Sequence, residues 1–317
     1  MATRAVVRMQ RDCGALANGS SADNNALVSA IWMLHPHGGR IEFEPGNYVF
    51  NQQVFDFMGL SLDFVGLGGR EAVTITTPYA PGLDFRNLRG SAIRNMMFNS
   101  PRPGFGLTLR QVYGLVMENI RFVNFQSGLL VGDEADGMIG SVQNLVLRQV
   151  KFDGDASAVN GDIVQIRNAN GMSGYDLDLS GHSTSHGLHF VNNGLLCDTF
   201  TFTNMLVKGC GYGVRAGEFG PANNVNFFGL RIDDNHISGL HLEPGPTVPL
   251  YAWQAHGLWI KSYNYAAIMS MTAAGSSLKD SYFNGLILDP VYQHGLVVQG
   301  PSNSFERVYR DGQPVTP

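Results

Sequence analysis

GLHL, at residues 239–242, belongs to a short pattern in which a glycine is followed by two apolar residues with one variable residue between them. Nine further copies, one degenerate, are GLSL at 59, GLDF at 82, GLTL at 106, GLLV at 128, GDIVQI at 161, GLHF at 187, GVRA at 213, AIMS at 267 and GLVV at 295. Successive copies begin 22 to 33 residues apart. A recurrence this regular is typical of a solenoid, in which each repeat packs on the next.

The segments between the copies have the pattern of strands. VNFFGLRID (225–233) and TFTFTNMLV (199–207) alternate apolar with polar residues and end at Gly, Asn or Asp. Three short strands in each repeat predict an all-β parallel β-helix, a solenoid of about ten coils stacked at about 4.8 Å. We expect one elongated domain over residues 37–317.

One clear helix is predicted, in SSADNNALVSAIWML at residues 20–34. Ser21 or Asp23 is the expected N-cap residue. The apolar stripe consists of Ala26, Leu27, Ala30, Ile31 and Leu34. The open end of a solenoid would expose core strands to water, so this helix is expected to cap it. Residues 1–36 are therefore predicted to be an N-terminal segment with a capping helix.

Two motifs carry a resemblance to a known family. DCGALANGSSADNNALVSAI (12–31) resembles the opening of the pectate-lyase-superfamily β-helix, with Cys13 in place of the usual aromatic residue. HGGRIEFEPGNYVF (37–50) resembles the strand motif that follows it. This resemblance implies a right-handed parallel β-helix. Members include pectin-degrading enzymes, polygalacturonase-like hydrolases, epimerases and bacteriophage tail spikes, and the structural opening motif does not choose among them.

Composition narrows the possible partners and compartments. The net charge of −5 supplies no dominant basic surface, which argues against a nucleic-acid partner. No apolar run approaches the roughly 20 residues that span a bilayer, so no membrane insertion is expected. MATRAVVRMQRDCG, at residues 1–14, shows no signal peptide. Three scattered cysteines favour buried thiols in a protein made in a reducing cytoplasm.

The variable letter of the repeat predicts a functional surface. Alternate residues of a strand face opposite sides, so the variable letters should form one outward column along the stack. The column and its neighbours comprise Asp84, Arg86, Thr108, Arg110, Leu130, Gln165, Arg167, His189, Arg215, His241, Glu243, Val297 and Gln299. Arginine suits bidentate recognition of carboxylates, so Arg86, Arg110, Gln165 and Arg167 are predicted to bind an anionic glycan. The alternative is a solvated sheet face on which arginine stems cover apolar neighbours.

Two insertions add further candidates. Tyr251 and Trp253 lie in EPGPTVPLYAWQAHG (243–257), where they are expected either to stack on sugar rings or to pin the loop to the solenoid. GDEADG (132–137) contains Asp133, Glu134 and Asp136, whose oxygens suit Ca²⁺, but a solvated turn is the favoured interpretation. No cofactor and no metal site are predicted.

For catalysis, the best candidates are Arg215 with His189 and His241, each 26 residues away and so on adjacent coils. An elimination needs a base beside a uronate whose carboxylate a cation neutralises. Hydrolysis instead needs two carboxylates about 5–9.5 Å apart. Glu218 and Glu243, 25 residues apart, fit adjacent coils. Other candidate carboxylates are Asp176, Asp178, Asp233 and Asp234.

The combined features favour a bacteriophage virion spike. It would be made in the host cytoplasm without a signal peptide, associate with other virion proteins, and bind host cell-surface polysaccharide, with depolymerisation left open. The resemblance implies a homotrimer. Two alternatives remain: a non-catalytic structural or receptor-binding virion protein, and a secreted bacterial polysaccharide lyase or glycoside hydrolase. The sequence does not decide whether the protein is an enzyme.

Overall fold

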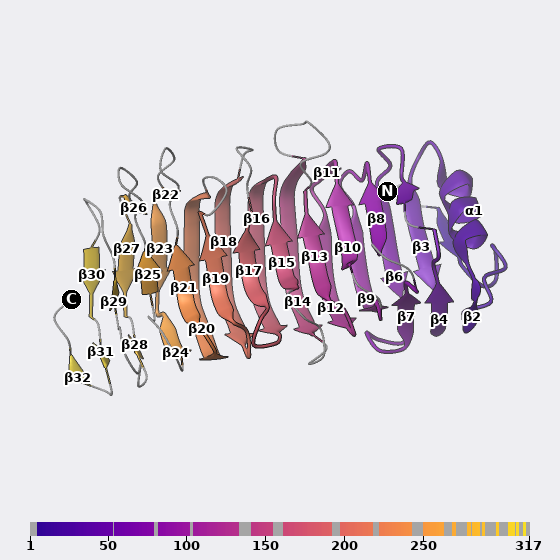
Figure 1. Ribbon diagram of the computed structural model, residues 1–317. Coiled ribbons are helices and arrows are strands. Elements are labelled where there is room, and N and C mark those ends of the chain that lie inside the picture. The colour runs from indigo at the N-terminus through magenta and orange to yellow at the C-terminus, as the bar shows by residue number, and fades with distance from the viewer. Residues whose placement is uncertain are drawn as a thin grey trace.

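The computed structural model describes residues 5–52, 54–78, 82–101, 104–132, 141–154, 161–191, 197–217, 222–242 and 250–262. Further towards the C-terminus it describes 268–270, 278–279, 281–285, 287–288, 296–297, 304–307, 309–310 and 313–314. Within these residues the chain is an elongated solenoid of parallel strands with a helix at its N-terminal end (Figure 1). This is the predicted right-handed parallel β-helix.

One wall of the solenoid is a ten-stranded parallel sheet whose strands pair in chain order. Its strands are β5 (Val54–Asp56), β8 (Leu83–Arg86), β10 (Phe105–Arg110), β13 (Ser127–Val131), β15 (Asp162–Ile166), β17 (His186–Phe190), β19 (Tyr212–Ala216), β21 (Ser238–Leu242), β25 (Ile268–Ser270) and β29 (Leu296–Val297). Eight of these ten strands contain the predicted glycine repeats or directly follow their glycine, which explains why the letters recur.

The other walls belong to a twenty-stranded sheet that bends around the solenoid. Its strands are β1 (Val6–Arg8), β2 (Asn18–Ala22), β3 (Gly39–Phe43), β4 (Gly46–Val49), β6 (Leu62–Gly66), β7 (Val73–Thr76), β9 (Ala92–Asn99), β11 (Val112–Tyr113), β12 (Val116–Val123), β14 (Val142–Asp153), β16 (Ala169–Ser180), β18 (Cys197–Lys208), β20 (Asn223–Asn235), β23 (Trp253–His256), β24 (Trp259–Ser262), β27 (Tyr282–Asn284), β28 (Ile287–Leu288), β30 (Ser304–Glu306), β31 (Tyr309–Arg310) and β32 (Gln313–Pro314). β22 (Leu250–Tyr251) and β26 (Leu278–Lys279) form a separate pair.

The number of coils is slightly lower than predicted, at about eight turns rather than ten. GLSL at residue 59 is not a rung of the ten-stranded sheet. Gly59 lies in a turn with φ of +75°, and Leu62 already begins β6 of the other sheet. The rung that pairs with β8 is instead Val54–Asp56, with Phe55 opposite Phe85. Here the four-letter pattern arose from a turn that happened to precede an apolar strand.

Helix α1 (Asn24–Leu34) covers the N-terminal end of the solenoid (Figure 1). Its buried residues are the predicted stripe of Ala26, Leu27, Ala30, Ile31 and Leu34. The helix begins at Asn24, directly after Asp23, which is one of the two predicted N-cap residues. Asp23 occupies the N-cap position without a capping hydrogen bond, because its carboxylate accepts hydrogen bonds from the backbone N–H groups of Leu16 and Val49 at 2.8 and 3.1 Å. Within the described residues, no helix is long and apolar enough to cross a membrane.

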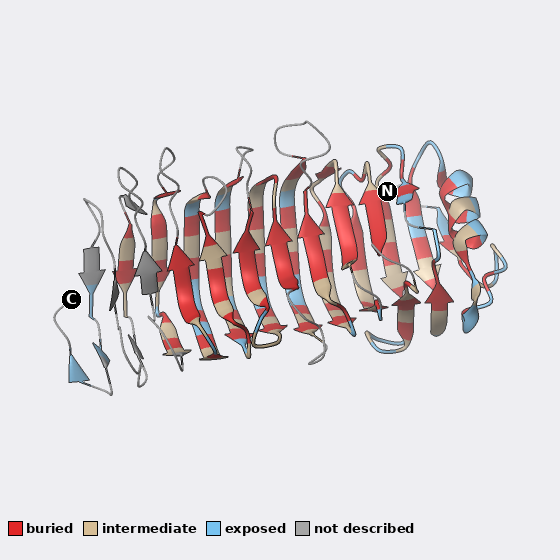
Figure 2. Cartoon of the chain, viewed as in Figure 1, coloured by how far each residue is buried: buried red, intermediate tan, exposed pale blue. Residues whose placement is uncertain are grey.

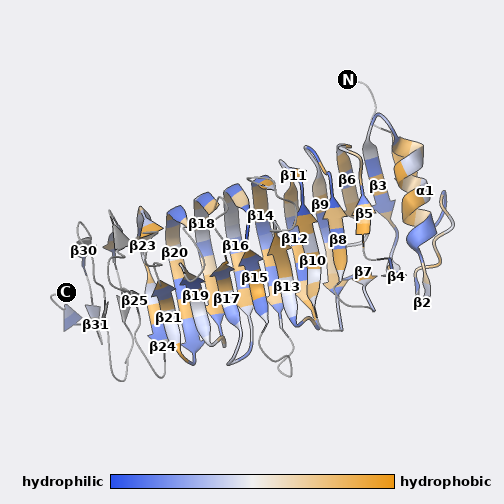
Figure 3. Cartoon of the chain, turned by 45° about the horizontal axis from the view of Figure 1, so that its top comes forward, coloured by the Kyte–Doolittle hydropathy of each residue, from blue (hydrophilic) through white to orange (hydrophobic). Residues whose placement is uncertain are grey.

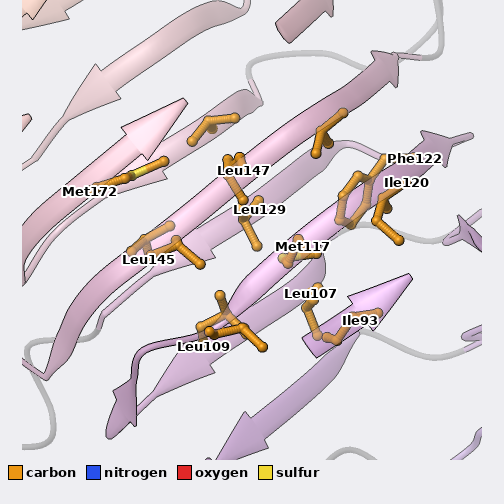
Figure 4. Close-up of a cluster of buried hydrophobic side chains, with 14 of the residues drawn as sticks. Ile93, Leu107, Leu109, Met117, Ile120, Phe122, Leu129, Leu145, Leu147 and Met172 are labelled. Atoms are coloured by element: carbon orange, nitrogen blue, oxygen red, sulfur yellow. The ribbon is translucent and has the colours of Figure 1, made fainter. Parts of the chain in front are cut away.

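Identical side chains stack on one another inside the coils. Phe98, Phe122 and Phe152 pair in register on β9, β12 and β14, and neighbouring rings are stacked at centroid distances of 5.1 and 4.6 Å. Leucine, isoleucine and methionine side chains from both sheets fill the space beside them (Figure 4). Because every rung repeats this inward set, the register of each strand is fixed by its neighbour.

Single residues with positive φ bend the long strands of the twenty-stranded sheet around a corner. Asn95, Asn119, Gln149, Asp176 and Asn204 take this conformation on successive rungs. Asparagine tolerates the left-handed region better than most residues, and the Asn119 amide also donates to Asn95 Oδ1 at 2.9 Å. This corner lies on the twenty-stranded sheet, away from the column of variable residues in the ten-stranded sheet.

Candidate functional site

The predicted column of variable residues exists. Thr108 pairs with Asp84 and Leu130, Leu130 with Gln165, and Gln165 with His189. The column continues through Arg215 and His241 on β19 and β21. Adjacent rungs are separated by about 4.8 Å, so the stacking brings together residues far apart in the sequence. Hydrophilic segments interrupt the apolar colouring of these strands in Figure 3.

The column is buried more deeply than an open sheet face. His189 is 5% exposed and His241 is 2% exposed, and Thr108 and Gln165 are also buried. Figure 2 shows that the strands of this wall are mostly buried. Leu130 is buried as well, although it is not part of the hydrophobic core that contains its neighbours Leu129 and Val131. The buried residues of the column therefore form the floor of this face, beneath other side chains. The expectation of a fully open surface is wrong at these positions.

Arginine side chains stand at the edge of this floor. Arg86 donates from Nε and Nη2 to Asp84 Oδ2 at 3.0 and 2.6 Å, and the Nε of Arg110 lies 3.2 Å from the same oxygen. Arg167 donates from Nε to Gln165 Oε1 at 2.8 Å. The side chains of Arg86 and Arg110 keep 33% and 20% of their surface exposed. They are the accessible part of the column.

The densest polar cluster surrounds Asp162, at the start of β15. Its carboxylate contacts Nδ1 of His186 at 2.5 Å and Nδ1 of His189 at 3.0 Å, and it also accepts a hydrogen bond from the Gln165 amide. One carboxylate thus holds both histidines of β17 by the same ring nitrogen. Asp162 and His189 are buried, whereas His186 is partly exposed.

Residues of the next two strands complete the cluster. Nη1 of Arg215 lies 3.2 Å from Nε2 of His186, and its guanidinium lies 5.0 Å from the centre of the Tyr212 ring. The Tyr212 ring also lies 4.9 Å from that of His241. The predicted neighbours His189, Arg215 and His241 are therefore brought together, along with an aspartate, a third histidine and a tyrosine that the prediction did not include.

The hydrogen bonds determine which ring nitrogen of His186 and of His189 carries the proton. A guanidinium only donates, so Nε2 of His186 accepts from Arg215 and its Nδ1–H donates to Asp162. Nδ1–H of His189 donates to the same carboxylate. Its Nε2 is then an unprotonated nitrogen, buried and without a hydrogen-bond partner within the described residues. A lone pair held in this way is the group that a general base requires.

The pKa values agree with this arrangement. Burial raises the pKa of Asp162, but the hydrogen bonds from His186 and His189 together outweigh it, so the pKa lies well below its ordinary value and the carboxylate is charged. Burial lowers the pKa of His189, and the hydrogen bond to Asp162 only partly offsets this. His189 is therefore neutral at neutral pH and available to accept a proton.

Asp162, His186 and His189 are also the residues that could hold a metal ion. Their ligand atoms lie within 4.8 Å of one another, and a set of two imidazoles and one carboxylate suits Zn²⁺. The guanidinium of Arg215 contacts His186 and opposes a second positive charge at this place. The histidine Nδ1 atoms are already engaged with the carboxylate, so the geometry favours an acid–base cluster.

Other predicted site residues lie elsewhere. Glu218, Glu243, Asp133, Glu134 and Asp136 fall outside the described residues. The four other candidate carboxylates lie on the twenty-stranded sheet, on a different wall from the column: Asp176 and Asp178 in β16, and Asp233 and Asp234 in β20.

The two predicted aromatic contacts differ from each other. Tyr251 is 39% exposed and keeps the surface that sugar stacking needs. Trp253 is fully buried, its ring packs near Phe190 and Phe227, and its indole N–H donates to the carbonyl of Ala222 at 2.7 Å. The expectation that Trp253 faces a glycan is therefore wrong. It pins the chain to the solenoid, which was the second interpretation.

The residues that sequence reasoning missed share one position. Asp162, His186 and Tyr212 pair in register, immediately before the strand positions of the repeat glycine. Strict alternation would place them inside, on the same side as Leu188. Their contacts with His189 and Arg215 show that they face outward. His186 and Tyr212 are polar residues directly before the glycine in two successive copies, and this was the signal that could have identified the position.

The chain shares the parallel β-helix fold of several solved pectate-lyase-like structures. No protein-family model matches the chain, and no curated protein is similar to it in sequence. Among solved structures, the Dettilon tailspike protein superposes with a TM-score of 0.54 at 11% identity, over 96% of this chain and 68% of that one.

Two enzymes superpose to a similar extent. The family 28 exopolygalacturonase of Yersinia enterocolitica has a TM-score of 0.52 at 13% identity, over 99% of this chain and 80% of its own. The GH87 α-1,3-glucanase of Streptomyces thermodiastaticus has a TM-score of 0.52 at 14% identity, over 99% and 70%. Similarity at these identities establishes the fold alone.

Proposed function

We propose that this protein binds an acidic polysaccharide along its ten-stranded sheet and cleaves it by β-elimination at the cluster around Asp162. The observation that carries the proposal is the unpartnered Nε2 of His189. The ring of His189 is held through Nδ1 by Asp162, and His189 pairs with Arg215 on the next rung. A base and a cation are the two groups that elimination beside a uronate carboxylate requires.

Each step of the reaction has a group in the cluster. The Arg215 guanidinium pairs with the uronate carboxylate and so makes the neighbouring C5–H more acidic. His189 Nε2 takes this proton, a double bond forms between C4 and C5, and the glycosidic bond from C4 to its oxygen breaks. The Tyr212 hydroxyl gives a proton to the departing oxygen. His189 then gives its proton to solvent, and Tyr212 takes a proton from solvent, which restores both residues.

Access to the base requires movement. Nε2 of His189 is buried, so the sugar reaches it only when side chains that cover the column shift. Catalytic contacts commonly tighten only when substrate is bound. Arg215 and Tyr212 are partly exposed, and they are the groups a glycan meets first.

Hydrolysis has weaker support among the described residues. Asp84 and Asp162 are the two carboxylates buried in the column, and they lie on strands three rungs apart, about 14 Å. This exceeds the separation of about 5–9.5 Å that glycosidases use. Asp84 is also bound to Arg86 and Arg110.

The proposed biological role is that of a bacteriophage spike that acts on host cell-surface polysaccharide. The chain shares its fold with the Dettilon tailspike protein. Burial raises the pKa of Cys197 and Cys210 to about 12, and these free thiols suit a protein made in the host cytoplasm. We propose that it is carried on the virion as a homotrimer, with other virion proteins as partners.

The test is incubation of the protein with a panel of acidic capsular polysaccharides and uronate polymers. We expect ultraviolet-absorbing unsaturated uronate products, and sedimentation of the protein as a trimer. If new reducing ends appear without an increase in ultraviolet absorbance, the reaction is hydrolysis and not elimination. Binding without any product would leave the receptor-binding virion protein as the function, and failure to bind any acidic polysaccharide would refute the proposal.

A further inference from the structure

Arginine occurs on every second rung in the middle of the ten-stranded sheet. Arg110 ends β10, Arg167 directly follows β15, and Arg215 lies in β19. β13 lies between the first two of these strands and β17 between the last two. Rungs are about 4.8 Å apart, so successive arginines are separated by about 10 Å along the solenoid.

The rungs between them carry no charged side chain at the matching positions. Leu130 and Gly132 occupy the rung of β13, and His189 and Val191 occupy that of β17. Leu130 is a buried apolar residue on the outer face of a polar column. At these matching positions, the rungs of β10, β15 and β19 therefore carry a guanidinium and the rungs between them carry none, along the stretch that leads to the proposed base.

Arg86 lies outside this alternation, one rung before Arg110. Its two hydrogen bonds to Asp84 match its charge with a carboxylate of its own strand, two residues away. The three groups Asp84, Arg86 and Arg110 together carry one net positive charge, so the first part of the column presents a single charge to a ligand.

We infer that the groove selects polysaccharides in which uronates alternate with uncharged sugars, an inference that rests on the proposed function. An extended pyranose chain along the solenoid advances by nearly one rung per sugar, so every second sugar meets an arginine. A polymer with a carboxylate on each sugar would place every second charge over Leu130 or His189, where it loses water without gaining a cation. Arg215 lies two residues earlier in its strand than Arg167, about 7 Å sideways, so the glycan crosses the sheet obliquely.

The test compares oligosaccharides that carry equal charge. The probes are octasaccharides of hyaluronan, heparosan and chondroitin, with four carboxylates each, and tetramers and octamers of galacturonate and mannuronate. Titration calorimetry of the intact protein is expected to give affinity at least tenfold higher for one or more alternating octamers than for either tetramer or either octamer of the continuous polymers.

Affinity that rises only with the number of charges would overturn the inference, although acidic polysaccharides would still be bound and the proposed function would stand. Failure of every acidic probe to bind would refute both. Leu130→Arg adds a charge to an uncharged rung and should shift preference towards the continuous polymers by about tenfold. Leu130→Gln, which fills the same place without charge, should not, and an equal shift in both variants would contradict the charge argument.

Discussion

Replacing Asp162 by asparagine tests the acid–base cluster most directly, because the two side chains have nearly the same shape. The carboxylate accepts three hydrogen bonds, from Nδ1 of His186, Nδ1 of His189 and the Gln165 amide. An asparagine offers one carbonyl oxygen and an NH₂ group that donates. At least one histidine must then lose its Nδ1–H bond and move its proton to Nε2.

His186 keeps its proton on Nδ1, because its Nε2 accepts from the Arg215 guanidinium, which can only donate. His189 therefore makes this change, its Nε2 no longer has a lone pair, and the base is lost. General base catalysis contributes about 10²- to 10⁴-fold, so we expect kcat for the release of unsaturated product to fall by an amount in this range. The assay is the initial rate of ultraviolet absorbance with a saturating acidic polysaccharide. KM should change little, since the arginines that hold the glycan remain.

The matched control is Asp176→Asn in β16. Asp176 has a φ of +54°, which asparagine tolerates, and its Oδ1 accepts from the Asn204 amide at 2.7 Å, which an asparagine carbonyl can also do. This variant should keep the rate of the parent. If Asp162→Asn, with an unchanged unfolding transition, retained more than half of the parental kcat, the assignment of His189 as base would be refuted.

Three further predictions follow from the same contacts. Because burial lowers the pKa of His189, the acid limb of the pH–rate profile should have its midpoint below the ordinary histidine value of 6.5, and a midpoint above 6.5 in kcat/KM would contradict a neutral base. Phe122→Ala removes a fully buried ring from the stack and should cost about 3–5 kcal/mol in urea unfolding, whereas Phe228→Ala on the exposed face should cost far less, and similar losses would argue against the stack. Trp253→Phe leaves the Ala222 carbonyl without its indole donor and should cost about 1–3 kcal/mol of stability with glycan affinity unchanged, so weaker glycan binding would restore Trp253 to the site.

The wall of the solenoid was predictable from sequence because its determinants are local and repeated. Leu188, Val214 and Leu240 pair in the register that the glycine pattern assigned, and the inward residues of α1 are those of the predicted stripe. In a stacked coil each rung meets the same environment as the one before it, so the sequence repeats what the structure repeats. Departures occur where a turn produces the same letters, as at Gly59.

The polar cluster was only partly predictable, because it depends on where the strand alternation fails. His189, Arg215 and His241 follow from period-two alternation and the spacing of 26 residues. Asp162 and His186 are the first residues of β15 and β17, and their side chains turn outward against the parity rule.

The first residue of these strands is therefore the informative position for function. A residue inside the strand faces outward on a nearly flat sheet and meets only its neighbours on adjacent rungs. A residue at the start of its strand approaches the column from the side, so it can contact two side chains of the next rung at once, as Asp162 contacts both histidines of β17. A solenoid built from identical rungs gains a distinct chemical site where polar residues at the start of a strand and polar column residues coincide. Within the described chain this coincidence occurs at β15, β17 and β19, on the same stretch of the sheet as Arg167 and Arg215.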